Sequence, residues 1–248
     1  MKIFAKKFSP LHIPNCGLWL ESSKGVTLVD SAVSNWKDSS GHNRNAVQDT
    51  STKRPTYTEL GLNGRPTLTF TSATSQRLNI TSGLDLVQNV GGFTAFCVCQ
   101  TSSLATAQTA LLVCANTTST YRINMSRTTG NQYQLRGRIT DANSAATILS
   151  TSTYGTDPLI ISGIYDCTNA DMFQYINGVG EGSPNLNYGT AGNTSDTASA
   201  ALYIGSLTSS QYWNGYIAEI IIYTRALSSY ERKKIESRLG YKYNIAVS

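Results

Sequence analysis

Short apolar segments that alternate with polar residues recur along the chain and predict β-strands. In residues 201–207, Tyr203, Gly205 and Leu207 alternate with neighbours that would face the other way, and a period of two is typical of strands. Residues 217–223 form a nearly continuous apolar run, which is the pattern of a strand covered on both faces. We therefore predict a β protein in which this late strand is buried.

One helix is expected near the end of the chain. Ser228 and Glu231 have the spacing of a capping box, in which each side chain bonds the backbone N–H of the other residue. Gly240 stands where a helix would end. Basic residues mark the side expected to face solvent, namely Arg232, Lys233, Lys234 and Arg238. We expect this helix to cover a β domain.

A hairpin is predicted over residues 121–140, around a Gly-Asn turn. The apolar positions of both arms are expected on one face, and they are Tyr121, Ile123, Met125, Tyr133, Leu135 and Ile139. If Met125 pairs with Tyr133, then Arg122 lies opposite Arg136 and Arg138 lies on the diagonal. Like charges that face each other cost ~0.2–1 kcal/mol per pair.

The three arginines of this hairpin leave two interpretations open. In the first, the long side chains of Arg122, Arg136 and Arg138 simply splay into water. In the second, they form a cationic patch that binds an acidic sugar, a phosphate or a carboxylate of a neighbouring subunit, because guanidinium groups match such anions bidentately.

Composition favours a single domain with many short strands. The 248 residues include only 14% charged residues, and they are rich in Ser, Thr, Asn and Gly, as expected for strands joined by polar turns. No linker or low-complexity segment divides the chain. The net charge of +5 comes from scattered residues, so the sequence does not predict a nucleic-acid partner.

Cysteine usage and the N-terminus bear on where the protein is made. Five cysteines cannot all pair within one chain, and we expect them to be buried thiols of a protein made in a reducing compartment. The N-terminus lacks the apolar stretch of roughly 7 to 15 residues found in secretory signals. Nothing approaches the ~18 apolar residues of a membrane span.

Catalytic residues are not expected. Glycanases need two carboxylates ~5–5.5 Å apart across the scissile bond, and the best acidic candidate, Glu219, is followed only by apolar residues. His12 and His42 are the only histidines, and neither has a partner nearby in the sequence. The sequence therefore does not predict a Ser-His-Asp triad or a histidine-rich zinc site.

Several motifs resemble the concanavalin A-like lectin/glucanase superfamily, in particular its laminin-G-like and pentraxin-like domains. Asn214-Gly215, the run Ile217–Ile220 and the run Arg225–Ser228 occur in the order found there. The loop that begins at Asp38 and the Asn-Gly-x-Pro run at Asn63 also match. The resemblance implies an all-β fold: a two-sheet antiparallel jelly-roll sandwich over residues 11–248, with a short C-terminal helix and an N-terminal arm of residues 1–10.

The opening of the chain is similar to that of bacteriophage proteins. Phe8–Pro10 and Gly17–Leu20 resemble the start of single-domain phage proteins and of phage tail or surface modules. This resemblance implies a place on the virion surface, on the tail or the head, after synthesis in the host cytoplasm without a signal peptide. An extracellular or bacterial-surface location is the alternative.

The laminin-G-like resemblance also implies a possible calcium site, because such domains often bind calcium at the rim of the sandwich. Calcium requires hard oxygen ligands, and the candidates are Asp38, Asn43 and Asp166, with Asn169 and Asp171 beside the last. Ordinary roles of Asp and Asn in turns explain these residues equally well.

Aromatic residues in polar loops are candidates for sugar binding, because a pyranose has an apolar C–H face and a polar edge. Tyr212, Trp213 and Asn214 lie in a predicted rim loop, and Tyr188 lies in a long Asn- and Gly-rich loop. The resemblance gives the alternative for Trp213, since the aromatic residue before this Asn-Gly packs under the loop in the family.

Two functions from different classes remain open. The first is a non-catalytic recognition module that binds host cell-surface carbohydrate. The second is a structural or decoration subunit of a phage particle, which mainly contacts other virion proteins. The basic segment 1–9 would suit docking onto an assembly, and a second copy of the chain is left open as a partner.

Overall fold

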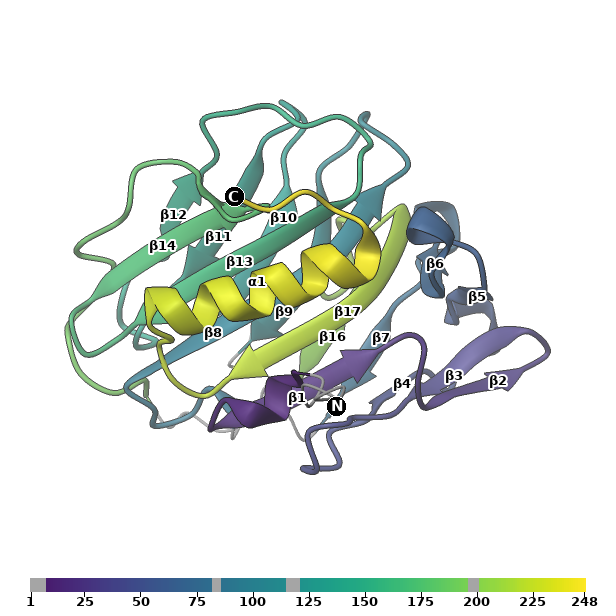
Figure 1. The fold of residues 1–248 in the computed structure, drawn as a ribbon, viewed down its shortest axis with the longest axis horizontal. Helices are drawn as coiled ribbons and strands as arrows, with labels where there is room; N and C mark the ends of the chain where they lie inside the picture. The colour runs from purple at the N-terminus through teal and green to yellow at the C-terminus, as the bar shows by residue number, and fades with distance from the viewer. Residues whose placement is uncertain (1–7, 82–85, 115–120, 196–200) are drawn as a thin grey trace, which may run out of the picture.

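The computed structural model describes residues 8–81, 86–114, 121–195 and 201–248, which form two packed layers of antiparallel strands and one α-helix (Figure 1). The strands are β1 (Cys16–Glu21), β2 (Val26–Val29), β3 (Ala32–Trp36), β4 (Ala46–Val47), β5 (Thr56–Thr58), β6 (Thr67–Phe70), β7 (Leu78–Ile80), β8 (Gly92–Thr101), β9 (Gln108–Cys114), β10 (Tyr121–Arg127), β11 (Tyr133–Gly137), β12 (Ala146–Leu149), β13 (Leu159–Asp166), β14 (Asp171–Ile176), β15 (Val179–Gly180), β16 (Leu202–Ile204) and β17 (Gly215–Tyr223). The helix is α1 (Ser229–Tyr243), and the short 3-10 helices are η1 (Pro10–His12), η2 (Ser51–Lys53), η3 (Leu62–Gly64) and η4 (Ser72–Thr74).

The first layer has the strand order β1-β17-β8-β13-β14-β15, and the second has the order β4-β7-β16-β9-β10-β11-β12. At one end the layers are joined, because β6 pairs with β17 and with β5, and β3 pairs with β4 and β5. The main core fills the space between the layers. This arrangement confirms the predicted jelly-roll sandwich with a C-terminal helix.

Strand β17 is covered on both faces, as its apolar run predicts. Ile220 and Ile222 pack into the core between the layers, whereas Ile221 and Tyr223 pack against the helix side. Helix α1 lies across this second face of the first layer, over β8, β13 and β17 (Figure 1). The outside of the first layer is therefore largely occupied by the protein's own helix.

The start of the helix matches the prediction, but its end and one of its faces do not. The capping box between Ser228 and Glu231 is present. Helix α1 ends at Tyr243 instead of at Gly240, and its C-cap Asn244 is in the left-handed conformation. Gly240 lies within the helix, and a Cβ there would approach a Val247 methyl to 2.6 Å. Arg232, expected in solvent, is buried and ion-paired with Glu236.

The predicted register of the β10–β11 hairpin is wrong by two residues. Met125 pairs with Leu135, not with Tyr133, and Arg136 pairs with Asn124, so Arg122 does not face Arg136. The local alternation suits either register, and the observed one is fixed by packing against β9 and β12.

A bulge in β10 overturns a second expectation. Tyr121 pairs with Cys114 and Ile123 pairs with Val113, which leaves Arg122 as an extra residue. Such an insertion changes which face the following or preceding side chain takes. Ile123 remains in the main core, whereas Tyr121 packs with Tyr203 on the other side of the layer.

Other expectations concern the termini and the cysteines. Residues 1–7 of the predicted arm lie outside the described residues, while Phe8 packs against the domain and the carbonyl of Pro10 accepts a hydrogen bond from Tyr223 at 2.9 Å. Buried free thiols are confirmed at four positions: Cys16, Cys97, Cys99 and Cys167. In the described part of the chain, no helix is long and apolar enough to cross a membrane.

Candidate functional site

The outer face of the second layer is the side turned away from the core. Strand alternation places Tyr203 there, because its neighbours Leu202 and Ile204 both point into the core. The bulge in β10 adds Tyr121, which packs with Tyr203 and Leu207. Two tyrosines from distant parts of the sequence therefore meet on this face.

Three arginines extend this aromatic pair in both directions. The guanidinium carbons of Arg136 and Arg138 lie 4.9 Å and 5.9 Å from the centroid of the Tyr121 ring, and that of Arg77 lies 5.5 Å from the Tyr203 ring. Each such cation–π contact contributes about 0.5–1 kcal/mol at an exposed site. We call these five residues the arginine–tyrosine row.

The three cations of the row are held differently. Arg77 donates a hydrogen bond to the Thr208 carbonyl, and Arg138 donates to the Asp141 carbonyl at 3.3 Å. Burial lowers the pKa of Arg138. Arg136 is half-buried, and among the described residues its guanidinium has neither a hydrogen bond nor an ion pair. It is the group of the row best placed to bind an anion.

Arg122 does not belong to this row. Its side chain is 2% exposed and reaches Asp141 at 2.8 Å and the Ser195 hydroxyl at 2.6 Å. Its role is to tie β10 to two loops, because a buried cation needs a paired anion. The predicted cationic patch therefore loses Arg122 and keeps Arg136 and Arg138.

The aromatic candidates in the loops are mostly buried. Trp213 is fully buried and donates its indole N–H to the Tyr216 carbonyl at 3.3 Å, which confirms the alternative that it packs under the loop. Tyr188 is also buried, its hydroxyl lies 3.0 Å from the Cys167 sulfur, and burial raises its pKa. Neither ring offers a platform to a sugar.

The rest of the predicted rim loop is tied to the sandwich. The Asn214 side chain accepts a hydrogen bond from the Ser72 backbone at 3.3 Å, and the Asn214 N–H donates to Gln108 at 3.0 Å. Tyr212 and Asn214 are half-buried there, and the neighbouring Gln211 is exposed. This loop therefore closes the end of the sandwich, and its single accessible ring does not form a platform.

The candidate calcium ligands lie in two separate loops. The buried Asp38 carboxylate accepts hydrogen bonds from the backbone of Trp19, Ser40 and Arg44, so it organises its own loop. Asn43 is exposed at a φ of 58°, and Asp166 accepts bonds from residues 168 and 169. Within the described ranges no three acidic, His or Cys residues group as metal ligands. Calcium binding stays a prediction.

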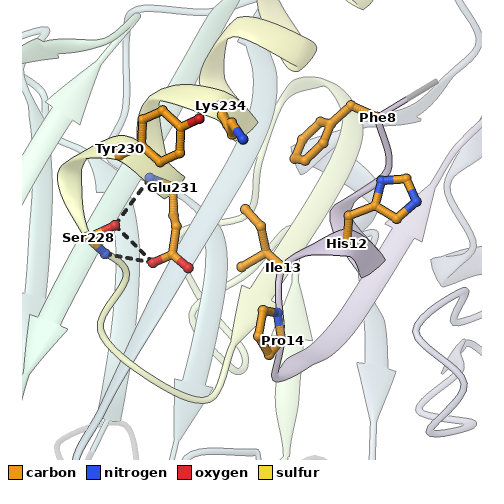
Figure 2. Close-up of a pocket in the computed structure, with 8 residues that line it drawn as sticks. All are labelled: Phe8, His12, Ile13, Pro14, Ser228, Tyr230, Glu231 and Lys234. Carbon is orange, nitrogen blue, oxygen red and sulfur yellow. Dashed lines mark hydrogen bonds between the residues drawn. The ribbon is translucent and has the colours of Figure 1, made fainter. Parts of the chain in front are cut away.

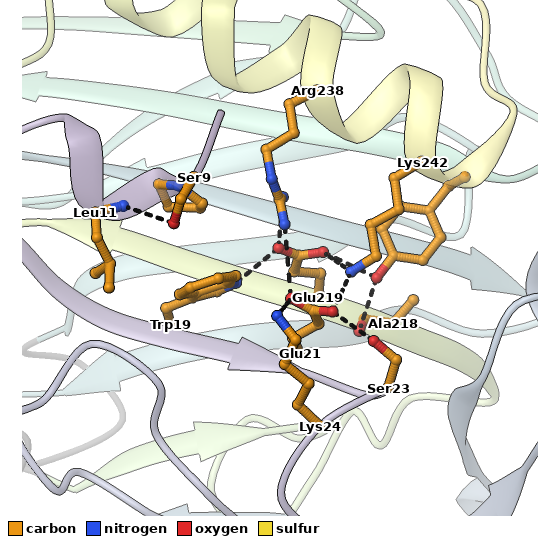
Figure 3. Close-up of polar contacts among 12 residues, drawn as sticks. Ser9, Leu11, Trp19, Glu21, Ser23, Lys24, Ala218, Glu219, Arg238 and Lys242 are labelled. Carbon is orange, nitrogen blue, oxygen red and sulfur yellow. Dashed lines mark hydrogen bonds and ion pairs between the residues drawn. The ribbon is translucent and has the colours of Figure 1, made fainter. Parts of the chain in front are cut away.

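A pair of buried glutamates lies beneath the helix, and it was not predicted from the sequence. Glu21 on β1 and Glu219 on β17 are direct cross-strand partners, and both are buried (Figure 3). Lys242 bridges them at 2.9 Å and 2.7 Å, and Arg238 lies 2.7 Å from Glu219. Sequence offers one signal for this pair. Arg238 and Lys242 are one helical turn apart, and each of two apolar strands contains a single glutamate.

The contacts of this pair with Arg238, Lys242 and Tyr243 tie α1 to the first layer. Glu219 also accepts hydrogen bonds from the Trp19 indole at 2.7 Å (Figure 3) and from the Tyr243 hydroxyl at 2.9 Å. Burial alone would raise the pKa of Glu21, but hydrogen bonds from Ser23 and Lys242 outweigh it and lower the pKa to about 2. The Glu21 carboxylate is thus charged, and the protein's own donors satisfy the hydrogen bonding of both carboxylates.

A pocket of about 470 Å³ lies between the N-terminal segment and the start of α1 (Figure 2). Phe8 and His12 form one side, Tyr230 and Lys234 form the other, and Ile13 lies between them (Figure 2). The remaining lining residues are Pro14, Ser228 and Glu231.

Most polar groups of this pocket are already engaged. Glu231 bonds Ser228 in the capping box and Arg225 at 2.5 Å, and the Arg225 hydrogen bond lowers the pKa of Glu231 to about 2. The Lys234 amine lies 4.4 Å from the centroid of the Tyr230 ring. The Glu231 carboxylate is thus already paired with Arg225, and the Lys234 amine lies over an aromatic ring.

The family assignment follows from the sequence as well as from the fold. Residues 72–231 match the family model described as the concanavalin A-like lectin/glucanases superfamily. The chain belongs to this superfamily. The predicted resemblance is confirmed at this level, and no curated protein matches the chain in sequence.

Several solved structures share the fold at low sequence identity. The sialidase module CBM40 of Ruminococcus gnavus, bound to α2,3-sialyllactose, has a TM-score of 0.51 and 18% identity over 61% of this chain and 85% of that one. Domain 4 of an arabinanase from Geobacillus stearothermophilus, in complex with arabinotriose, has a TM-score of 0.57 and 15% identity. The match covers 81% of this chain and 92% of that one. The botulinum neurotoxin serotype G binding domain has a TM-score of 0.64 and 14% identity. The match covers 91% of this chain and 51% of that one. Identities this low show the fold alone.

Proposed function

We propose that this protein is a non-catalytic recognition module that binds a cell-surface glycan through the arginine–tyrosine row. Two structures that share its fold hold carbohydrate, namely sialyllactose and arabinotriose. A fold alone does not define a ligand. The proposal therefore depends on the chemistry of the outer face.

The observation that carries the proposal is the state of Arg136. This half-buried guanidinium is held over the Tyr121 ring and lacks a counter-charge among the described residues. A planar guanidinium can donate two parallel hydrogen bonds to a carboxylate or to neighbouring hydroxyl groups. The half-exposed Tyr203 ring packs against Tyr121 on the same face and supplies an apolar surface three strands away from Arg136.

The absence of catalysis is supported by the position of the acidic residues. The cross-strand carboxylates Glu21 and Glu219 are enclosed under α1 and bound by Arg238 and Lys242. A glycosidase needs one carboxyl group as a proton donor and one as a nucleophile or base at the scissile bond. Asp141, whose carbonyl contacts Arg138 of the arginine–tyrosine row, is ion-paired through its carboxylate with the buried Arg122 at 2.8 Å.

We further propose a place on a virion surface, with a bacterial-surface location as the alternative. The support is the likeness of Phe8–Pro10 and Gly17–Leu20 to the openings of phage surface modules. Other virion proteins and a second copy of this chain would then be partners.

A glycan array, with calcium and with a chelator, tests the proposal. We expect the wild-type protein to bind a defined set of glycans and Arg136→Gln to lose them. The matched control is Arg65→Gln, which removes an equally charged side chain from an exposed site at the end of η3. A blank array, combined with attachment of the protein to phage particles, would favour the decoration subunit instead.

A further inference from the structure

We infer that the ligand is an extended acidic oligosaccharide that lies across the strands of the second layer, with its acidic unit at Arg136. This inference rests on the proposed function and names its ligand class. It is carried by one line of residues that crosses the outer face.

Backbone pairing aligns this line across seven strands. Each residue is the cross-strand partner of the next, and in order from β4 to β12 they are Val47, Asn79, Tyr203, Leu112, Asn124, Arg136 and Thr147. We call this line the transverse rung. Tyr203 is placed on the outer face because Leu202 and Ile204 point into the core, and Asn124 is placed there because Ile123 and Met125 point into the core.

Two carboxamides of the rung have unused hydrogen-bonding capacity. Asn124 is 1% exposed, and neither its side-chain nitrogen nor its oxygen has a partner. The side-chain oxygen of Asn79 is also buried without a partner. Buried polar atoms are nearly always hydrogen-bonded. Asn124 is too enclosed to touch a ligand on the surface, whereas Asn79 is half-buried and can offer its carboxamide there.

The spacing of these groups sets the length of the ligand. Neighbouring strands lie about 4.8 Å apart, and Asn79 and Asn124 are separated by three strand steps. The two carboxamides are therefore about 14 Å apart, and Arg136 lies one strand further. A single monosaccharide is too short to reach Asn79 and Arg136 together, whereas a chain of several units can.

Charge sets the direction of the ligand. Arg136 and Arg138 stand together at the β11 end, and Arg136 has no counter-charge among the described residues. At the β7 end, Arg77 already donates to the Thr208 carbonyl. An acidic unit is best neutralised at Arg136, which leaves the neutral units to Tyr203 and Asn79.

The test measures, by calorimetry, the affinity of the protein for each glycan that binds on the array. Each glycan is used in three forms: the full chain, the isolated acidic terminal unit, and the neutral chain in which the carboxyl group is reduced. We expect the full chain to bind at least tenfold more tightly than either fragment. Arg136→Gln should weaken the acidic chain about tenfold and bring its affinity close to that of the carboxyl-reduced chain. Asn79→Ala should weaken the full chain several-fold without affecting the terminal unit.

Arg65→Gln serves as the control in each measurement, and an unchanged melting temperature shows that a variant is folded. Glycans that are neutral, or a terminal unit that binds as tightly as the chain, would overturn this inference while the recognition function stands. A protein that binds no glycan at all would overturn both.

Discussion

Arg122 and Arg136 lie on neighbouring strands and show how surroundings decide the role of one residue type. Arg122 is enclosed and bonded to Asp141 and Ser195, which are 19 and 73 residues away in sequence. Arg136 is half-buried on a tyrosine ring. Sequence shows that both are basic, but the partners of Arg122 come from distant loops that no local pattern connects to it.

The first prediction separates these two roles. Arg122→Gln should lower the free energy of unfolding by about 2–3 kcal/mol, because it leaves a polar network without its cation. Arg136→Gln should change it by no more than about 0.5 kcal/mol, since the side chain is outside the core. Urea unfolding measures both values. Equal stability of the two variants would show that the Asp141 pair contributes nothing.

At the scale of elements, local signals were predictable and non-local ones were not. The capping box of α1 and the buried strand β17 follow from residues close in sequence. The β10–β11 register and the Arg122 bulge depend on packing against β9 and β12. The same limit explains the Glu21–Glu219 pair, whose members are joined only when β1 pairs with β17.

The second prediction concerns the docking of α1. Glu219→Gln should lower the free energy of unfolding by roughly 3 kcal/mol, because Arg238 and Lys242 lose the charge that they neutralise in a buried site. The matched control is Glu59→Gln, which changes an exposed residue in the same way. Urea unfolding followed by tryptophan fluorescence compares them, and an equally small effect of both would contradict the proposed role of Glu219.

The third prediction concerns the start of the helix. Ser228→Ala removes the hydroxyl that accepts the Glu231 N–H, and loss of such a cap costs about 1 kcal/mol. Thermal unfolding should show a melting temperature a few degrees lower. Ser229→Ala, at the next and exposed position, is the control and should leave it unchanged.

The fourth prediction concerns acid. The pKa values of Glu21 and Glu231 are lowered from 4.5 to about 2 in the folded protein. Their stabilising effect is therefore complete above pH 4.5 and is lost as the pH falls toward 2. Urea midpoints across this range should fall steeply for the wild type and less steeply for Glu21→Gln. Parallel curves would show that Glu21 does not contribute.

For the whole molecule, the two layers divide the work. Helix α1 covers the outer face of the first layer and is held there by Glu21 and Glu219. The second layer leaves the arginine–tyrosine row on its outer face. Arg136 and Arg138 were predictable as candidates from strand alternation, whereas Tyr121, Tyr203 and Arg77 join them only through the bulge and the strand order.

The central claim is that glycan binds on the outer face of the second layer. A crystal structure of the protein with its strongest array glycan tests it most directly. We expect the sugar to contact Tyr203 and Arg136, with the chain directed toward Asn79. A sugar bound in the pocket beside Phe8 and Tyr230, or at the loop around Tyr212, would contradict the account.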